Sequence, residues 1–155
     1  MARVEVIQDI SANDEMFQGN RTGYFKTAAS CLRCVELAMQ AAGMERPTSI
    51  LDLPCGHGRV LRMLKARFPE AQLTACDTNR DGVEFCARTF DAAPVYASDE
   101  PSSTRIEGSF DLVWVGSLLT HFDKDRWRGF MDLFMSVLAP GASWSSQPTE
   151  GAWRP

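Results

Sequence analysis

Apolar and polar positions alternate in blocks along the chain. Four short apolar runs have the length typical of buried parallel strands, at residues 50–53, 72–76, 94–97 and 110–116. Segments with apolar residues at helical spacing lie between or after them, at residues 57–67, 80–90 and 123–138. Strands that alternate with helices in this way predict an α/β fold with a doubly wound parallel sheet, covered on both faces. The connection 99–108 is too short for a regular helix, so we expect a loop with a turn there.

The first 44 residues differ from this alternating region. Residues 1–26 are mixed and polar without a clear period, and we interpret them as an arm or cap over the site. From Thr27 to Ala42 the apolar residues recur at helical spacing, and Gly43 is a typical helix stop. The chain therefore divides into an N-terminal cap and helix (1–44), a core (45–141) and a tail (142–155).

The tail does not continue the pattern. A buried strand is expected after Pro140 and Gly141, yet residues 142–148 are polar, lack alternation and contain Pro148. We expect this sheet to be incomplete at the C-terminal side, with an apolar edge exposed on the strand at 110–116. A one-base shift before Ala142 can restore an apolar, β-branched sequence, so we interpret the tail as aberrant through truncation or a frameshift. Low stability or aggregation is the expected consequence.

A glycine-rich turn follows the first predicted strand. Gly56 and Gly58 allow tight backbone conformations and close approach of a ligand, and the next helix begins there. A surface turn would use the same residues, but Asp77 ends the second strand about 20 residues later, where an acid binds ribose hydroxyls in doubly wound folds. The third glycine of a dinucleotide fingerprint is replaced by Leu61, and Asp52 would repel a pyrophosphate but suit a cationic ligand.

Charge and composition limit the partners. The 155-residue chain carries a net charge of −4, which argues against broad electrostatic capture of nucleic acid. The one basic cluster is expected on the solvent face of the first helix after the turn, opposite its apolar residues, and consists of Arg59, Arg62, Lys65 and Arg67. No apolar run approaches the roughly 20 residues that span a bilayer, so we expect a cytoplasmic protein without a membrane partner. The five cysteines fit a reducing compartment, and Cys31 and Cys34 lack the further ligands of a metal site.

Four motifs in register resemble the class I S-adenosylmethionine-dependent methyltransferases. The motifs are residues 52–58, Asp77, residues 109–113 and residues 138–141, and the resemblance runs from about Ser49 to Gly141. This family has a Rossmann-like fold, uses S-adenosylmethionine as cofactor, and in its small-molecule members methylates metabolites. One departure is Pro54, where the family usually has glycine. Because proline fixes φ and removes a donor, the loop should take a different local path or lose one backbone contact.

The resemblance implies a set of cofactor-binding residues. The first motif and its neighbours would hold the methionine part, namely Asp52, Pro54, Cys55, Gly56, Gly58 and Arg59. The ribose and adenine would be bound by Asp77, Thr78, Asn79 and Asp99. The floor of the site would be formed by Val115, Gly116 and Ser117. His121 follows the fourth strand and is a candidate general base, although it could equally shape the loop. Tyr24 in the cap is a candidate substrate contact, although it could equally pack on the sheet.

Three functions remain open at this stage. The first is methyl transfer from S-adenosylmethionine to an unidentified, small-molecule acceptor, in which the protein aligns the reactants and excludes water. The second is a cofactor-binding domain without turnover. The third is an NAD-dependent oxidoreductase, which Leu61 disfavours. The acceptor and the oligomeric state cannot be read from these residues.

Overall fold

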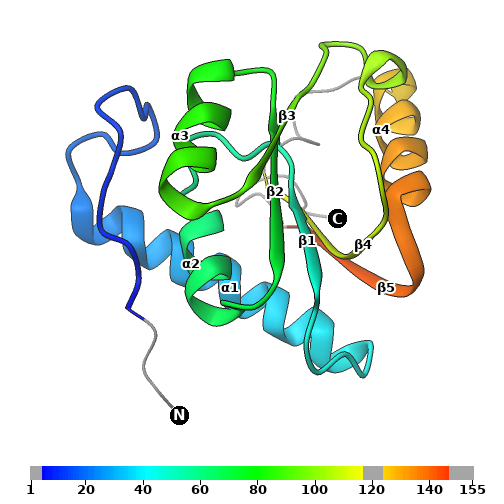
Figure 1. Cartoon of the computed structure of the whole chain (residues 1–155), viewed down its shortest axis with the longest axis horizontal. Coiled ribbons are helices and arrows are strands. Elements are labelled where there is room, and N and C mark those ends of the chain that lie inside the picture. The colour runs from blue at the N-terminus through cyan, green and yellow to red at the C-terminus, as the bar shows by residue number, and fades with distance from the viewer. Residues whose placement is uncertain (1–4, 117–123, 147–155) are drawn as a thin grey trace, which may run out of the picture.

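A computed structural model describes residues 5–116 and 124–146, and its centre is one parallel sheet (Figure 1). The five strands are β1 (Ser49–Asp52), β2 (Gln72–Asp77), β3 (Ala93–Tyr96), β4 (Phe110–Val115) and β5 (Leu138–Ser146). They lie in the order β3-β2-β1-β4-β5, and every pair is parallel. The predicted Rossmann-like α/β class is confirmed.

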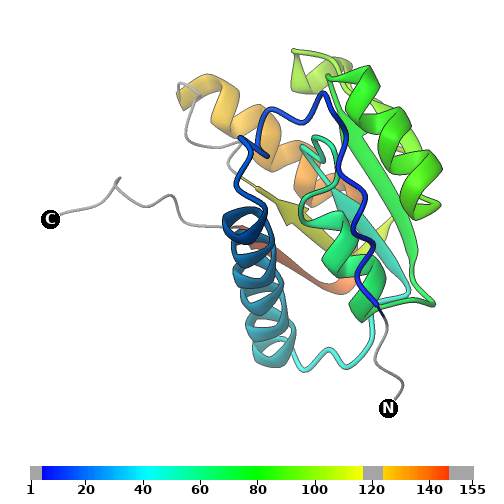
Figure 2. The same ribbon diagram turned by 90° about the vertical axis from the view of Figure 1, so that its left-hand side faces the viewer.

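Helices cover both faces of this sheet, as Figure 2 also shows. They are α1 (Arg21–Ala41), α2 (Leu61–Arg67), α3 (Arg80–Phe90) and α4 (Lys124–Val137), with a short 3₁₀ helix η1 (Pro101–Ser103) before β4. Successive residues of β1 point to opposite faces: Ile50 packs in a core with residues of α1, α2 and α3, whereas Leu51 packs with residues of α4. Burial on both faces explains why the strands are apolar throughout.

The predicted element bounds differ from the observed ones at two helix starts. Helix α1 begins at Arg21 and not near Thr27, because the Asn20 side chain caps it by accepting a hydrogen bond of 2.9 Å from the Gly23 amide. Helix α2 begins at Leu61 and not at residue 57, because Gly58 has a φ of 77° and the turn extends to Val60. Helix α3 has its predicted bounds.

Strand β5 corrects the prediction for the tail. Residues 142–146 form a strand along β4, with Leu112 paired to Ser143 and Val115 to Ser146. Strand pairing uses backbone groups, so the open edge of β4 can bind a polar segment, and Pro140 falls in the irregular register before that pairing. The predicted exposed edge of β4 is therefore wrong. Residues 147–155 of the predicted tail lie outside the described residues.

The topology also fixes where polar side chains can meet. From β1 the chain moves through α2 to β2 on one side, whereas β4 lies on the other side of β1. Doubly wound sheets bind ligands at such a switch point, beyond the carboxyl ends of the strands. Asp52 stands at the end of β1 at this position. Among the described helices, none combines the length and apolar character of a membrane span.

Candidate functional site

The turn between β1 and α2 is built around two glycines with positive φ. Gly56 has a φ of 51° and Gly58 a φ of 77°, both in the region that favours glycine. A Cβ on Gly58 would overlap the ring of Phe90, whereas space beside Gly56 is open. Gly58 is thus needed for packing against α3, and Gly56 leaves the backbone accessible to a ligand. We call residues 55–60 the glycine turn.

Pro54 leads into this turn through a cis Leu53–Pro54 peptide bond. The residues on either side keep their backbone contacts: the Leu53 amide donates to Trp114 at 3.1 Å and the Cys55 amide to Cys76 at 3.0 Å. These two hydrogen bonds tie the loop to β2 and β4.

Asp77 connects β2 to the glycine turn. Its Oδ2 accepts a hydrogen bond of 2.7 Å from the Gly56 amide, and its Oδ1 accepts one of 2.9 Å from the Asn79 amide. The two motifs that the sequence placed 21 positions apart are therefore in direct contact. A carboxylate offers about four acceptor positions. The Thr78 hydroxyl also donates to Oδ1 at 3.4 Å, so Asp77 retains one acceptor position for a hydroxyl of a ligand.

Asp52 is the least satisfied polar group at the site. Its side chain is 1% exposed, and within residues 5–116 and 124–146 its Oδ2 has no hydrogen-bond partner. Burial, and then the charge of Asp77, raise the pKa of this carboxyl well above its ordinary value. A buried acid without a partner suits a ligand that brings positive charge. S-adenosylmethionine carries a sulfonium and an ammonium, so the residues fit this group.

Other predicted cofactor residues follow β2, β3 and β4, and their roles stay predictions. Thr78 and Asn79 are exposed just after β2, and Asn79 caps α3 by accepting from the Gly82 amide at 3.2 Å. Asp99 is exposed shortly after β3. Val115 is buried and Gly116 is half-buried at the end of β4. Ser117 and His121 lie outside the described residues.

Thiols form the rear wall of the glycine turn. A hydrogen bond with the Cys86 thiol, together with burial, raises the pKa of the Cys55 thiol, which therefore remains neutral. The Cys86 sulfur lies 3.6 Å from the Gly56 carbonyl oxygen. Both side chains are buried and pack against the turn as small groups. In the described part of the chain, no three His, Cys, Asp or Glu side chains gather as a metal site would need.

Two features of the site were not anticipated. Gly82 in the first turn of α3 packs so closely on the turn that a Cβ would overlap the Gly56 carbonyl. His57 is buried, and its Nε2 lies 2.8 Å from Oδ2 of Asp81, whose pKa is lowered mainly by this hydrogen bond. A glycine inside a helix that directly follows the acid of β2 was the available signal for Gly82. Nothing local in the sequence indicates the His57–Asp81 contact.

The predicted basic face of α2 is partly wrong. Arg62 has no exposed surface, and its Nη1 donates to the carbonyl oxygens of Ile7 at 3.0 Å and Asp9 at 2.8 Å. The N-terminal segment covers this side of α2. Arg62 is therefore buried, although its charge and its spacing along the helix predicted a solvent-exposed position. Arg59 is half-buried, and its guanidinium carbon lies 5.9 Å from the centre of the Tyr24 ring.

Tyr24 is buried among these groups. Its side chain is 3% exposed, and its hydroxyl donates a hydrogen bond of 2.6 Å to Oδ2 of Asp14. Burial and this contact raise its pKa above the ordinary range. The structure thus places the predicted substrate residue in packing beneath the N-terminal segment. Its role toward a substrate stays a prediction.

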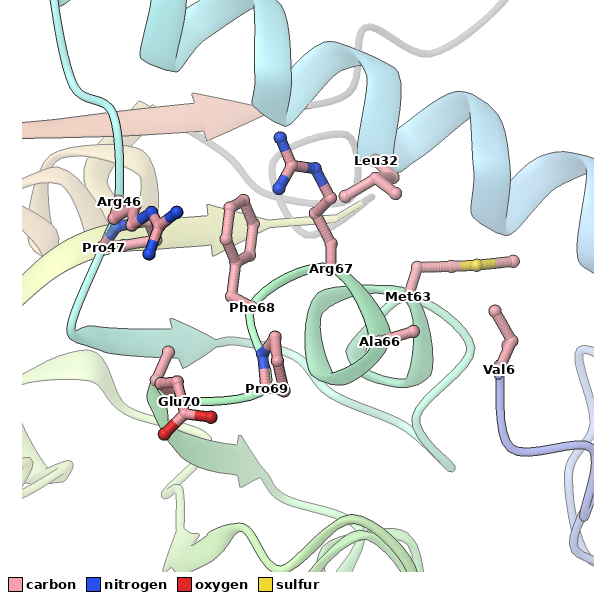
Figure 3. Close-up of a pocket in the computed structure, with 11 residues that line it drawn as sticks. Val6, Leu32, Arg46, Pro47, Met63, Ala66, Arg67, Phe68, Pro69 and Glu70 are labelled. Atoms are coloured by element: carbon pink, nitrogen blue, oxygen red, sulfur yellow. The ribbon is translucent and has the colours of Figure 1, made fainter. Parts of the chain in front are cut away.

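A cavity of about 500 Å³ lies at the other end of the sheet (Figure 3). Its walls include Val6, Leu32 of α1, Met63 of α2 and Pro47 just before β1. Because Pro47 and Ala71 precede β1 and β2, this cavity is at the amino ends of those strands. It is therefore separate from Asp52 and Asp77, which stand at the carboxyl ends.

Comparison with known proteins agrees with this geometry. Residues 50–141 match the family model described as a methyltransferase domain. The structure resembles DesVI of Streptomyces venezuelae (TM-score 0.71, 16% identity, 94% of this chain and 61% of that chain). It also resembles the sugar N-methyltransferase KedS8 of Streptoalloteichus (TM-score 0.70, 21% identity, 97% and 60%). The N-methyltransferase NodS of Bradyrhizobium japonicum, solved with S-adenosylhomocysteine, has a TM-score of 0.62 at 22% identity, with coverage of 86% and 66%.

A curated relative corrects one prediction. The ribosomal RNA small subunit methyltransferase C of Haemophilus influenzae is 37% identical over 82 residues, which is 50% of this chain and 24% of that protein. The chain thus spans about a quarter of the length of the curated relatives it matches. This match contradicts the exclusion of nucleic acid as a partner. The net charge describes the whole surface, and a protein with a net negative charge can still bind RNA through one face.

The family model matches more than half of the chain, and the fold agrees with it. Three predictions from the sequence are confirmed for the family: the methyltransferase resemblance, the enzyme class and S-adenosylmethionine as cofactor. The chain belongs to the methyltransferase domain family of class I S-adenosylmethionine-dependent methyltransferases.

Proposed function

We propose that this chain binds S-adenosylmethionine at the carboxyl ends of β1 and β2 and transfers its methyl group to an acceptor. The observation that carries the proposal is the buried Oδ2 of Asp52, which has no hydrogen-bond partner among the described residues and lies next to Asp77 and the glycine turn. When bound, the cofactor supplies an electrophilic methyl group on a sulfonium. If the glycine turn were only a surface turn that binds no ligand, no positive charge from the described residues would compensate the buried Asp52.

The protein's own groups would bind and orient. Asp52 provides negative charge toward the cationic end of the ligand, and the open backbone at Gly56 allows close approach. Asp77 has one acceptor position left for a ribose hydroxyl, and Asp99, Thr78 and Asn79 would lie beside the adenine. Alignment of the acceptor and exclusion of water then provide most of the catalysis. His121 is the proposed base where the acceptor must lose a proton.

We further propose a small-molecule acceptor. The basic residues of α2 do not form one exposed patch, because Arg62 is buried and Arg67 is paired with Glu36 at 2.6 Å. KedS8, which the chain resembles in fold, is a sugar N-methyltransferase. RNA is the second candidate acceptor, since the relative of 37% identity acts on ribosomal RNA. Methyl-transfer assays with amino sugars, small amines and ribosomal RNA separate the two.

The first test is Asp77→Asn with S-adenosylhomocysteine as the probe. Loss of a charge-assisted hydrogen bond to a ribose hydroxyl should weaken binding about tenfold, because such a bond is worth roughly 1.5 kcal/mol or more. Isothermal titration calorimetry on protein with an unchanged circular dichroism spectrum measures this. The matched control is Glu84→Gln, an exposed acid on α3 that should bind as the parent does.

Each alternative has its own outcome. Equal affinity of folded Asp77→Asn and parent would mean that the site is wrongly assigned. Tight binding with no transfer to any acceptor would indicate a cofactor-binding domain without turnover. Thermal protection by NAD, with none by S-adenosylmethionine, would indicate an oxidoreductase.

A further inference from the structure

Residues 5–20 form an N-terminal arm that runs alongside α2 before the chain enters α1 (Figure 2). Arg62 of α2 binds this arm through hydrogen bonds. Its Nη1 donates to the carbonyl oxygens of Ile7 and Asp9, and its Nε donates to the Gly58 carbonyl oxygen at 3.2 Å. One guanidinium therefore bonds both the arm and the glycine turn.

The burial of Arg62 is unusual for a cation. In the described residues no carboxylate pairs with it directly; instead its Nη2 lies 3.4 Å from the Tyr24 hydroxyl, which donates to Asp14. Its guanidinium carbon is 5.3 Å from the ring centres of both Tyr24 and Phe90. Burying a charge in this way is expensive, and an apolar side chain of similar size could fill the space. A role beyond packing is therefore indicated.

A second contact joins the arm to the same turn. Asn13 of the arm donates a hydrogen bond of 3.0 Å to Oδ2 of Asp81, and this oxygen also contacts Nε2 of His57 at 2.8 Å. His57 precedes Gly58, which Arg62 holds. Both contacts of the arm thus converge on two adjacent residues of the glycine turn.

We propose that Arg62 is a positioning residue of the cofactor site, which couples the N-terminal arm to the glycine turn. When a ligand orders the glycine turn, the hydrogen bonds of Arg62 also order the arm. An ordered arm, through the same hydrogen bonds, increases the affinity of the glycine turn for the ligand. The coupling to a ligand rests on the proposed function, because it assumes that the turn binds the cofactor. The contact between arm and turn does not depend on it.

Hydrogen–deuterium exchange of the arm amides, with and without S-adenosylhomocysteine, tests this coupling. In Arg62→Lys the charge remains but the forked donors are lost, so the arm should exchange about tenfold faster before ligand is added. Ligand should protect arm and turn together in the parent, but only the turn in the variant. Calorimetric affinity should fall about tenfold in Arg62→Lys, which corresponds to about 1.4 kcal/mol.

The matched control is Arg67→Lys, the same change on the same helix. Arg67 is 44% exposed and its guanidinium pairs with Glu36 of α1, outside the arm and the turn, so arm exchange and affinity in its variant should match the parent. A purely structural arginine would lower the melting temperature in Arg62→Lys yet leave the ligand-induced protection of the arm intact. That result, or an unchanged affinity, would overturn the proposal.

Two further outcomes keep the test decisive. If the parent fails to bind S-adenosylhomocysteine, the proposed function fails, while arm exchange in Arg62→Lys still decides whether the arginine holds the arm. If Arg62→Lys does not fold, Tyr24→Phe replaces it. That variant removes the hydroxyl between Arg62 and Asp14 and should show smaller changes in the same direction. Parent-like arm exchange and affinity in Tyr24→Phe would then refute the coupling.

Discussion

Two carboxyl groups a short distance apart have opposite surroundings at the end of the sheet. Asp77 accepts backbone hydrogen bonds from Gly56 and Asn79, whereas Oδ2 of Asp52 accepts none from the described residues. The charge of Asp77 and burial both disfavour ionised Asp52. A site that is unfavourable for the protein alone and favourable with a cationic ligand is typical of binding sites that trade stability for function.

Asp52→Asn should therefore make folding less dependent on pH. A raised pKa in the folded state means that the contribution of Asp52 to stability is fully present below its ordinary pKa, near 3.8, and is lost as pH rises toward the raised value. The parent should lose about 1.4 kcal/mol of unfolding free energy per pH unit in that window relative to the variant. Urea unfolding at pH 4, 5, 6 and 7 measures the slope.

The same variant should bind S-adenosylhomocysteine more weakly, because the ligand's ammonium loses its anionic partner. Other groups, including Asp81 and Asp111 with their lowered pKa values, titrate alike in both proteins and cancel in the comparison. Parallel stability curves over this pH range would show that Asp52 ionises normally in the folded chain.

The contact between Asp77 and the glycine turn was predictable from spacing, because parallel strands bring their carboxyl ends to one edge. The burial of Arg62 was not predictable in the same way. Its helical spacing predicts a polar face, and segments distant in the sequence, among them Ile7, Asp9 and the ring of Phe90, bury that face. Local periodicity carries no information on such long-range coverage.

At the scale of elements, one acid of β4 anchors the start of β1. Oδ2 of Asp111 accepts hydrogen bonds from the Thr48 amide at 2.7 Å, the Thr48 hydroxyl at 2.7 Å and the Ser49 amide at 3.1 Å. These contacts lower the pKa of Asp111, the Thr48 hydroxyl having the largest effect. They fix the register in which the two central strands meet, and hence where the end of β1 lies relative to β4.

Asp111→Asn should destabilise the fold by about 1–2 kcal/mol at neutral pH, since charge-assisted hydrogen bonds become neutral ones. Because the folded pKa is lowered, this stabilisation is present above the ordinary pKa and is lost as pH falls through the lowered one. Chemical unfolding at pH 7 and pH 3 measures both effects. The control is Asp132→Asn, an exposed acid on α4. Equal stability of parent and Asp111→Asn at pH 7 would contradict the anchoring role.

Strands and helices differed in how well the sequence predicted them. Strands β1 to β4 and helix α3 followed from apolar runs and helical spacing. The start of α1 depended on the cap at Asn20, and β5 depended on the open backbone edge of β4, which offers pairing to a segment whatever its side chains. Patterns of side-chain polarity cannot show an interaction that the backbone alone makes.

At the scale of the molecule, the two ends of the sheet differ in the groups that they present. The carboxyl ends of β1 and β2 carry the acids and the glycine turn, whereas the amino ends border the cavity of about 500 Å³ (Figure 3). The walls of that cavity are largely apolar, with Arg46, Arg67 and Glu70 among the lining residues. If α2 is a rigid spacer between the two ends, changes at the cavity should alter stability without altering the cofactor site.

Ala66→Leu tests this separation, because Ala66 lines the cavity from α2. The larger side chain can cover apolar walls and has nearly the helix propensity of alanine, so the unfolding free energy should rise by about 1 kcal/mol. Affinity for S-adenosylhomocysteine should stay unchanged. Gly58→Ala, in the glycine turn before α2, should instead lower both stability and affinity, because its Cβ would overlap Phe90 and distort the turn. Thermal unfolding and calorimetry on both variants measure these effects, and a large loss of affinity in a folded Ala66→Leu would mean that α2 transmits strain from the cavity to the glycine turn.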